Sequence, residues 1–448
     1  MLALWLVINH DRRFLLFVRI QGLGMKTAKV DDQKTYFLPY IVFSVATLFY
    51  FYDFFLGVFP SAIASDLMRA YHIDAQGLGL LQACFFYGYM PMQIPAGLLF
   101  DRFGVRRVLV TAASICAFSI IIFAISSDIY LASAMRLLMG LSTAFSYVGA
   151  VIIASLWFPK RYLPMMAGLV QVVGSVGAVV GEAPIAYLVA TIGRVPSLLL
   201  MGVVGAGMAL MFWLLVRDHP NSAHYSHSEG HLSEWKKLKI IFSRSQNWWN
   251  FIYGFGIWGP MSVFSISWGV LFLRSAYELS NGKAALLMAF IWIGVAVGGP
   301  SLGWLSAHFY RRKPAMILGA LLGLIASIIL LYVPHLSPVA LCSCLFFYGV
   351  GSSAQAASFG IVDDNNSANV VGTVVGLQNM SFVTGGMTLV PLVGILLKKN
   401  WLGNMFEGVP FYTTGEFQHV LFLAPACFLL ALIVSIFFIK ETYCKHQI

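Results

Sequence analysis

Three ionisable side chains stand inside long apolar stretches of the sequence: Asp53, Arg136 and Glu182. A charge in the hydrocarbon of a bilayer costs at least about 2.5–3.5 kcal/mol on insertion scales, so each is a functional candidate if these stretches span a membrane. Two carboxyl groups and one guanidinium could form a paired cluster in which one acid gains and loses a proton. A structural alternative stays open, in which Arg136 ties helices together and Glu182 is its partner.

The composition of the chain determines which elements can carry these residues. The chain has 448 residues, of which 59% are hydrophobic and 10% are charged. An ordinary soluble domain is about 45–50% apolar and about 25% charged, so a large soluble enzyme is excluded. The net charge of +10 does not indicate a nucleic-acid partner, because the Lys and Arg residues lie in short loops and form no basic face.

Apolar runs of about 20 residues recur along the chain and predict 12 membrane-spanning helices. The predicted spans are 36–62, 76–98, 108–126, 130–156, 164–190, 195–216, 247–273, 283–305, 315–333, 337–360, 372–397 and 417–439. None alternates apolar with polar residues as the strands of a lipid-facing barrel would. The sequence therefore predicts an all-α integral membrane protein.

The basic residues predict the orientation of these helices, because loops rich in Lys and Arg remain in the cytoplasm. Of the 28 Lys and Arg residues, 21 fall on one side, six on the other, and Arg136 lies within a helix. Both termini are therefore expected in the cytoplasm. With no targeting signal in the sequence, we expect a multi-pass protein of a bacterial cytoplasmic (inner) membrane. Asp53, Arg136 and Glu182 lie about 9–14 Å from the noncytoplasmic ends of their helices, at a shared depth.

One long polar segment, 217–246, separates the helices six from six and predicts a cytoplasmic linker. It divides the chain into an N-terminal bundle (36–216) and a C-terminal bundle (247–439), with cytoplasmic segments at 1–35 and 440–448. We expect residues 1–24 to be an upstream-start extension or a disordered tail. The four histidines of the linker have no Cys or carboxylate at ligand spacing, so we expect no metal and no cofactor.

The two bundles share a sequence repeat. Gly97, Leu99, Phe103 and Arg106 recur 206 positions later as Gly303, Leu305, Phe309 and Arg312. A second match has an offset of 208 and pairs Gly168, Leu169 and Gln171 with Gly376, Leu377 and Asn379. Duplicated bundles with a site at the midplane between them are an architecture of secondary transporters.

The loop between the second and third predicted helices, residues 97–107, resembles the signature loop of the major facilitator superfamily. The resemblance rests on Asp101, Arg102, Gly104 and Arg106, while Val105 replaces the first basic residue of the pattern. It implies two pseudo-symmetric six-helix bundles and a transport function. It also implies that these four residues help to close the cytoplasmic face. The second copy has lost the Asp, Arg and Gly of the pattern, so we expect a weaker latch there.

Narrower resemblances concern the relatives and the coupling residue. Residues 51–55, 76–110 and 157–159 are similar to bacterial permeases labelled sugar-phosphate-permease-like, including phagosomal nutrient transporters. Arg136 and Gly140 resemble the family's helix 4 motif, in which an arginine is associated with proton coupling. We therefore expect proton coupling or substrate contact at Asp53, Arg136 and Glu182.

The resemblance also implies which helices line a central cavity, namely the first, fourth, seventh and tenth. The polar and aromatic residues expected to line it are Tyr50, Tyr147, Trp258, Ser262, Tyr348 and Gln355. Each has a structural alternative, because Ser and Gln often join helices by hydrogen bonds.

The second bundle has no ionisable residue at comparable depth, which bears on the substrate. A sugar-phosphate dianion needs basic groups and is disfavoured. We expect a small polar solute, namely an amino acid, a short peptide or a carboxylate, taken up by proton symport through a monomeric permease. The alternatives are a sugar-phosphate antiporter, a drug efflux pump and a solute sensor. An enzyme is not expected, because no nucleophile–base pair, metal-ligand set or phosphate loop occurs. Gly174, Gly177, Gly181 and Pro184 predict helix packing and a kink.

Overall fold

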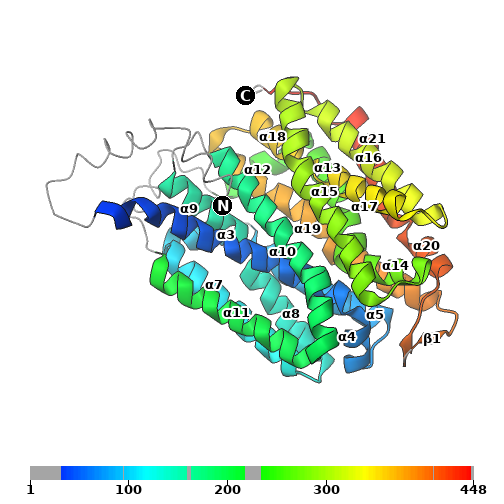
Figure 1. Ribbon diagram of the computed structural model, residues 1–448. Helices are drawn as coiled ribbons and strands as arrows, with labels where there is room; N and C mark the ends of the chain where they lie inside the picture. The colour runs from blue at the N-terminus through cyan, green and yellow to red at the C-terminus, as the bar shows by residue number, and fades with distance from the viewer. Residues whose placement is uncertain (1–31, 94, 159–162, 217–233, 407, 445–448) are drawn as a thin grey trace. The chain divides into compact units, whose positions relative to one another are not determined.

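The structure of the protein is a computed structural model that describes residues 32–93, 95–158, 163–216, 234–406 and 408–444 (Figure 1). The chain forms two units, residues 1–41 and 42–448. Of the first unit, residues 32–41 are described, and they begin helix α3. The predicted extension 1–24 and the four linker histidines lie outside the described residues, as does the linker segment 217–233.

Helices account for nearly all of the described residues before the linker. Their bounds are α3 (Asp32–Ala62), α4 (Ala64–Tyr71), α5 (Ala75–Tyr89), η2 (Met90–Met92), α6 (Pro95–Phe103), α7 (Val105–Ile125), α8 (Ile129–Thr143), α9 (Phe145–Trp157), α10 (Leu163–Ile192) and α11 (Arg194–Leu215).

The described residues after the linker are also helical, apart from one short hairpin. Their bounds are α12 (Glu234–Ser243), α13 (Ser245–Pro260), η5 (Met261–Trp268), α14 (Gly269–Tyr277), α15 (Asn281–His308), α16 (Lys313–Tyr332), α17 (Pro338–Ser352), α18 (Gln355–Asn365), α19 (Ala368–Lys399), β1 (Met405–Phe406), β2 (Val409–Pro410), α20 (Thr414–Leu421) and α21 (Leu423–Phe437). The turn η5 is π-helical, and strand β1 pairs antiparallel with β2.

Eleven helices among the described residues are long and apolar enough to cross a membrane. Each coincides, within a few residues at its ends, with one of the 12 predicted spans. The exception is the predicted span 76–98, which the structure divides into α5, η2 and α6. Pro91 and Pro95 explain the division, because proline has no N–H for the helical ladder and clashes with the preceding turn. The count of twelve therefore stays a prediction.

The internal repeat is visible in how the helices cross. A Cβ on Gly140 of α8 would lie 1.8 Å from the carbonyl oxygen of Phe85 on α5. A Cβ on Gly349 of α17 would lie 1.9 Å from that of Ile291 on α15. Only glycine allows helices to approach so closely. These crossings sit at repeat-related positions, so both halves are built around the same glycine-dependent contact.

Two further features recur with the same spacing. The predicted fourth and tenth spans each break, the fourth between α8 and α9 and the tenth between α17 and α18. Gly104, before α7, has φ 79°, and Tyr310, 206 positions later, has φ 52°. A left-handed residue is easy for glycine and costs other residues roughly 1–2 kcal/mol, so the second half keeps the turn despite the loss of its glycine.

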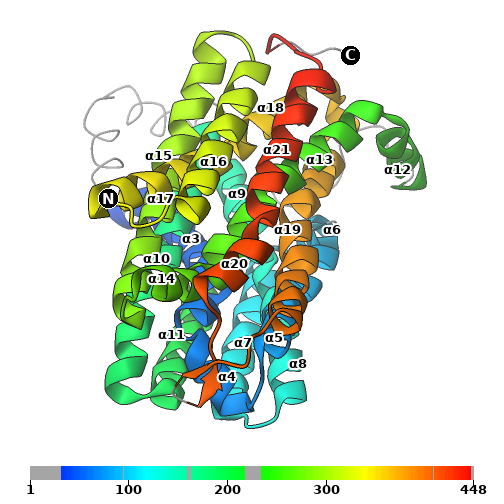
Figure 2. The same cartoon turned by 90° about the vertical axis from the view of Figure 1, so that its right-hand side faces the viewer.

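The two halves, residues 42–216 and 234–444, contact each other through two pairs of helices, α5 with α19 and α10 with α15 (Figure 2). Within the first half, α10 packs on α3 through glycine, since a Cβ on Gly177 would lie 2.0 Å from the carbonyl oxygen of Phe51. This is the packing role predicted for the glycines of the fifth span.

Candidate functional site

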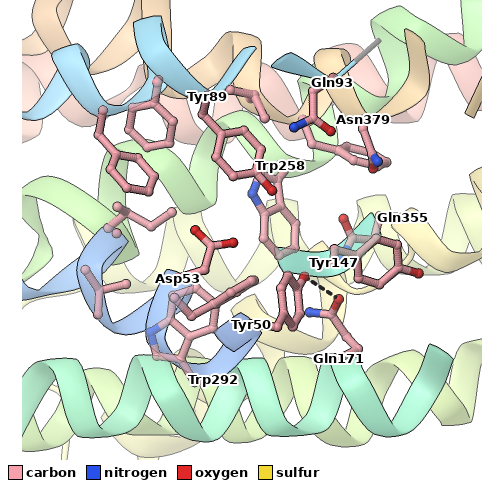
Figure 3. Close-up of a pocket in the computed structure, with 18 of the residues that line it drawn as sticks. Tyr50, Asp53, Tyr89, Gln93, Tyr147, Gln171, Trp258, Trp292, Gln355 and Asn379 are labelled. Atoms are coloured by element: carbon pink, nitrogen blue, oxygen red, sulfur yellow. Dashed lines mark hydrogen bonds between the residues drawn. The ribbon is translucent and has the colours of Figure 1, made fainter. Parts of the chain in front are cut away.

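A cavity of about 130 Å³ lies between the two halves, near the middle of the helices (Figure 3). A buried water needs about 10–15 Å³ on this measure, so the cavity could hold about ten waters or a small organic solute. Its walls come from both halves. They comprise Tyr50, Asp53, Phe54, Gly57, Val58, Phe85, Phe86, Tyr89, Gln93, Tyr147, Gln171, Trp258, Ile266, Trp292, Gln355, Phe359, Asn379, Phe382 and Val383.

Asp53 is the one carboxylate among the described residues that line this cavity, and none of those residues is basic. Tyr50, Asp53, Phe54 and Gly57 recur at helical spacing, so one face of α3 forms this wall. The Asp53 side chain is buried, and its Oδ2 accepts a hydrogen bond of 2.9 Å from the Ser146 hydroxyl on α9. The contact with the hydroxyl anchors the carboxyl group without neutralising its charge.

Arg136 on α8 is also buried but does not line the cavity. Its Nη1 donates to the carbonyl oxygen of Leu56 at 2.7 Å, and its guanidinium lies 4.9 Å from the ring centre of Phe85. The Leu56 carbonyl is available because Pro60, four residues later on α3, has no N–H to donate. Arg136 therefore joins α8 to α3 through a backbone group.

Glu182 on α10 is fully buried, and neither of its carboxyl oxygens has a hydrogen-bond partner among the described residues. The ion pairs that the structure describes include none of Asp53, Arg136 and Glu182. The paired cluster predicted from their shared depth is therefore not formed in this conformation. Equal depth does not determine which way a side chain points around its helix.

Four of the six residues predicted to line a central cavity lie on this one, namely Tyr50, Tyr147, Trp258 and Gln355 (Figure 3). The other two point elsewhere, which corrects the prediction. The Tyr348 hydroxyl donates to the carbonyl oxygen of Pro260 at 2.7 Å, inside the second half. Ser262 belongs to η5 and is fully buried away from the cavity.

Sequence reasoning missed several polar residues of the wall. Gln171 on α10 and Asn379 on α19 both line the cavity, and they are the repeat-related pair separated by 208 positions. Their position in the repeat, combined with their polarity in apolar helices, was the signal that could have found them. No comparable signal marks Trp292, because a tryptophan in an apolar helix is equally typical of packing.

Three N–H groups on the cavity residues have no acceptor among the described residues: Nε2 of Gln93, Nε2 of Gln171 and Nε1 of Trp292. The Tyr50 hydroxyl donates to Oε1 of Gln171 at 3.1 Å, which turns the Gln171 amide so that its NH₂ group remains unused (Figure 3). A buried donor without an acceptor costs roughly 1–3 kcal/mol. A solute with acceptor oxygens could remove that cost.

The signature loop, residues 97–107, begins shortly after the cavity residue Gln93 and takes up most of α6 and the start of α7. The side chain of Asp101 lies outside the described residues. The guanidinium of Arg102 lies 5.3 Å from the ring centre of Phe103, Gly104 supplies the left-handed turn, and Arg106 donates to the carbonyl oxygen of Trp213. These contacts of Arg102 and Arg106 are with residues of the first half, and a gating role for the loop stays a prediction.

At the opposite end of the helices, which we call the hairpin end because it carries β1 and β2, polar contacts join the halves. Nζ of Lys398 lies 2.9 Å from Oδ2 of Asp74, and the Ala75 N–H donates to the Tyr412 hydroxyl at 3.1 Å. Arg274 donates to the Ser65 hydroxyl at 2.7 Å. All of the described hydrogen bonds and ion pairs between the halves lie at this end.

Electrostatics at the hairpin end follow from these contacts. Burial alone would raise the pKa of Asp74, but the Gly77 N–H and the Lys398 ammonium outweigh it, and the pKa is lowered from its usual 3.8. Burial raises the pKa of the Tyr412 phenol to about 12. Asp74 is therefore ionised and Tyr412 neutral at physiological pH.

A strap, residues 402–413, carries Tyr412 from the second half to the first. Oε1 of Glu416 accepts from the Leu402 N–H at 2.9 Å, and Oε2 accepts from the Thr413 N–H at 2.6 Å. One buried carboxylate thus holds both ends of the strap, while its β2 strand contacts α4.

The comparison with known families identifies this arrangement. The family model described as Major Facilitator Superfamily matches residues 43–391, most of the chain. The chain belongs to the Major Facilitator Superfamily. The fold agrees, since a bacterial homolog of the human lysosomal transporter Spinster, solved in an inward-facing and unoccupied conformation, matches with a TM-score of 0.72. The two share 16% identity over 89% of this chain and 97% of that one.

Curated relatives of this superfamily member are also transporters. The uncharacterized transporter YybO of Bacillus subtilis is 24% identical over 87% of this chain and 91% of its own length. The probable sulfoacetate transporter SauU of Cupriavidus necator is 22% identical, covering 80% and 87%. The probable galactarate/D-glucarate transporter GudP of Escherichia coli is 24% identical, covering 84% and 91%. The protein is a multi-pass membrane transporter of this superfamily and not an enzyme.

Proposed function

We propose that this transporter carries a small organic-acid anion together with a proton, by alternating access of the central cavity to the two sides of the membrane. The observation that carries the proposal is the composition of the cavity wall. Among the described residues, it combines one carboxyl group, Asp53, with unpaired N–H donors on Gln93, Gln171 and Trp292, and includes no basic side chain.

The unpaired donors favour a solute rich in acceptor oxygens. An amide NH₂ group and an indole N–H can only donate, so their natural partners are carboxylate, sulfonate or hydroxyl oxygens. A phosphate dianion would demand paired cations, which the wall lacks. The names of two relatives agree with this class, since they describe transporters of sulfoacetate and of galactarate or D-glucarate.

Asp53 supports the coupling to protons. An ionised carboxylate beside an anionic solute is repelled in a low-dielectric site, whereas a neutral carboxyl group donates a hydrogen bond to that solute. Binding of the anion and binding of the proton at Asp53 therefore favour each other. Reciprocal coupling of this kind moves both species together through the cycle.

The location and direction of transport extend the same proposal. The excess of Lys and Arg in the loops of one side favours a bacterial inner-membrane protein with both termini in the cytoplasm. In that orientation the hairpin end faces outward, and a proton gradient directed inward drives uptake. One chain supplies both walls of the cavity, which favours a monomer.

The experiment is uptake by purified protein in proteoliposomes, with labelled D-glucarate, galactarate and sulfoacetate tested against glucose 6-phosphate. We expect accumulation of at least one acid that depends on a pH gradient, and none of the sugar phosphate. In Asp53→Asn, gradient-driven accumulation should fall about tenfold or more, which corresponds to about 1.4 kcal/mol of coupling free energy. Exchange of labelled for unlabelled solute should persist.

The matched control is Asp363→Asn, which removes an exposed carboxylate at the end of α18, away from the cavity. Gradient-driven accumulation that survives in Asp53→Asn would remove Asp53 from the coupling mechanism. Measurable net flux by the purified protein alone would also exclude the sensor alternative.

A further inference from the structure

A second cavity, of about 870 Å³, lies in the N-terminal half and is separate from the central one. It forms a groove along α7, between α6, α8 and the end of α11. Its walls are largely apolar and include Leu99, Phe103, Ile115, Leu141 and Phe145. From Arg106 to Ile115 the groove follows α7 for about 13 Å, close to the thickness of one leaflet of an approximately 30 Å hydrocarbon core.

One end of this groove is basic. Arg106 and Arg107, in the first turn of α7, line it together with Trp213, and the described residues that line it include no acidic side chain. Arg107 is exposed, and no hydrogen bond, ion pair or ring contact to the described residues is recorded for it. Trp213 is 55% exposed, as expected for a tryptophan at the boundary between hydrocarbon and headgroups.

In the C-terminal half, the residues related by the repeat to Arg106 and Arg107 are Arg312 and Lys313, and both contact carboxylates or carbonyl groups. The Glu441 carboxylate accepts from the backbone N–H groups of Arg312 and Lys313 at 2.9 and 3.0 Å. The Arg312 guanidinium pairs with Asp364 at 3.1 Å, and the Lys313 ammonium donates to the carbonyl oxygen of Ile436. In that half, carboxylates of the chain itself meet the basic loop.

We propose that the groove on α7 binds one anionic phospholipid, whose acyl chain lies against the apolar wall and whose phosphate lies at Arg107. An apolar groove with a basic mouth complements a lipid that has an apolar chain and an anionic headgroup. A zwitterionic lipid fills the groove equally well but lacks the net charge that Arg107 meets. The phosphate supplies, at Arg107, the negative charge that Glu441 and Asp364 supply in the other half.

The experiment measures retained lipid on the purified full-length protein by native mass spectrometry in dodecyl maltoside. Dioleoylphosphatidylglycerol is compared with dioleoylphosphatidylcholine, and thermal unfolding is followed in parallel. We expect one phosphatidylglycerol per chain, with an increase in the unfolding temperature, and weak retention of phosphatidylcholine. Glycerol phosphate and inorganic phosphate should change neither quantity, because they lack the acyl chain.

Two variants test the geometry, each with a matched control. Thr111→Trp places a large ring in the groove, and Ser114→Trp places the same ring one turn further along α7, exposed and away from the groove. Arg107→Gln removes the unpaired charge, and Arg311→Gln removes a charge from the other half at the same end. We expect Thr111→Trp to abolish retention, and Arg107→Gln to weaken it about fivefold, the effect of one basic residue near an anionic surface. Both controls should retain the lipid.

Three results would overturn the proposal. Equal retention by Thr111→Trp and Ser114→Trp would mean that the lipid binds elsewhere. Equal retention of the two lipids would mean that the groove recognises only acyl chains. Stabilisation by inorganic phosphate alone would mean that the basic end binds a free anion. None of these readouts depends on transport, so they are independent of the proposed substrate.

Discussion

In the N-terminal half, Arg136 on α8 donates a hydrogen bond to the carbonyl oxygen of Leu56 on α3. In the C-terminal half, Tyr348 on α17 donates one to the carbonyl oxygen of Pro260 on α13. Both contacts join the fourth predicted span of a half to its first span, beside the glycine crossings that the halves share. A neutral phenol is sufficient for this structural task in one half. The positive charge of Arg136 therefore exceeds what the fold requires, which directs attention to coupling.

The two halves thus share a scaffold and differ in their chemistry. Asp53, Arg136 and Glu182, the buried ionisable residues of the middle of the membrane, all belong to the first half. The second half contributes amide, indole and aromatic groups to the cavity. Both halves keep the same helix crossings, but the buried charged side chains at this depth lie in the first half.

The largest difference between the halves should follow from replacing the two equivalent donors. In Arg136→Gln, proton-driven uptake should fall about tenfold or more, because the buried positive charge of the first half is lost. In Tyr348→Phe, uptake should change less than about threefold, while the loss of a buried hydrogen bond costs about 1–3 kcal/mol of stability. Uptake and thermal unfolding of both variants provide the measurement. Equal loss of uptake in the two variants would show that the charge of Arg136 has no role beyond its hydrogen bond.

The shared scaffold can be tested by adding one methyl group to each half. Gly140→Ala and Gly349→Ala should each destabilise the protein by about 1–3 kcal/mol or more, because the new Cβ meets a backbone carbonyl of the facing helix. Gly97→Ala and Gly303→Ala, a repeat-related pair with open space around it, serve as controls and should change little. Unequal effects of the first two would show that the halves have diverged in packing as well as in charge.

The strap, residues 402–413, belongs to the second half, and its position should depend on the carboxylate of Glu416. In Glu416→Gln, one acceptor oxygen of the pair that holds the strap is replaced by an NH₂ group, so Leu402 or Thr413 loses its partner. We expect amide hydrogen exchange at Ala75, in the other half, to increase about tenfold, since its N–H bonds to Tyr412 on the strap. Unchanged exchange at Ala75 would mean that Glu416 does not position the strap.

The smallest effect should come from the ion pair at the same end. Asp74 has a lowered pKa, so its stabilising contribution is complete above the ordinary value of 3.8 and is lost as the pH falls below it. Lys398 is 51% exposed, so the pair should contribute only about 0–1 kcal/mol. A double-mutant cycle of Asp74→Asn and Lys398→Gln, measured at neutral pH and at pH 3, provides the value. A coupling that is undiminished at the lower pH would contradict the assignment to this carboxylate.

Apolar runs were sufficient to predict the membrane-spanning helices, because helices in lipid must satisfy their own backbone groups, and the repeat with the signature loop indicated the two bundles. It could not predict the break in the second span, since prolines at positions 91 and 95 are tolerated in many membrane helices. The cavity was predicted in part, through Asp53 and four aromatic or polar residues. Tyr348 and Arg136 show why the rest was missed. Which backbone carbonyl a side chain reaches depends on the rotation of two helices about their axes.

The strap held by Glu416 has a consequence for inhibition. Opening of the hairpin end would detach Tyr412 from Ala75, so we expect this surface loop to contribute to the barrier for that opening. Leu402 and Met405 are 73% and 57% exposed, which makes this loop accessible to an antibody fragment. We expect a binder that holds the strap closed to slow transport without occupying the cavity, because it favours the conformation that is closed at the hairpin end. The protein could therefore be inhibited from its hairpin end by a molecule that does not resemble its solute.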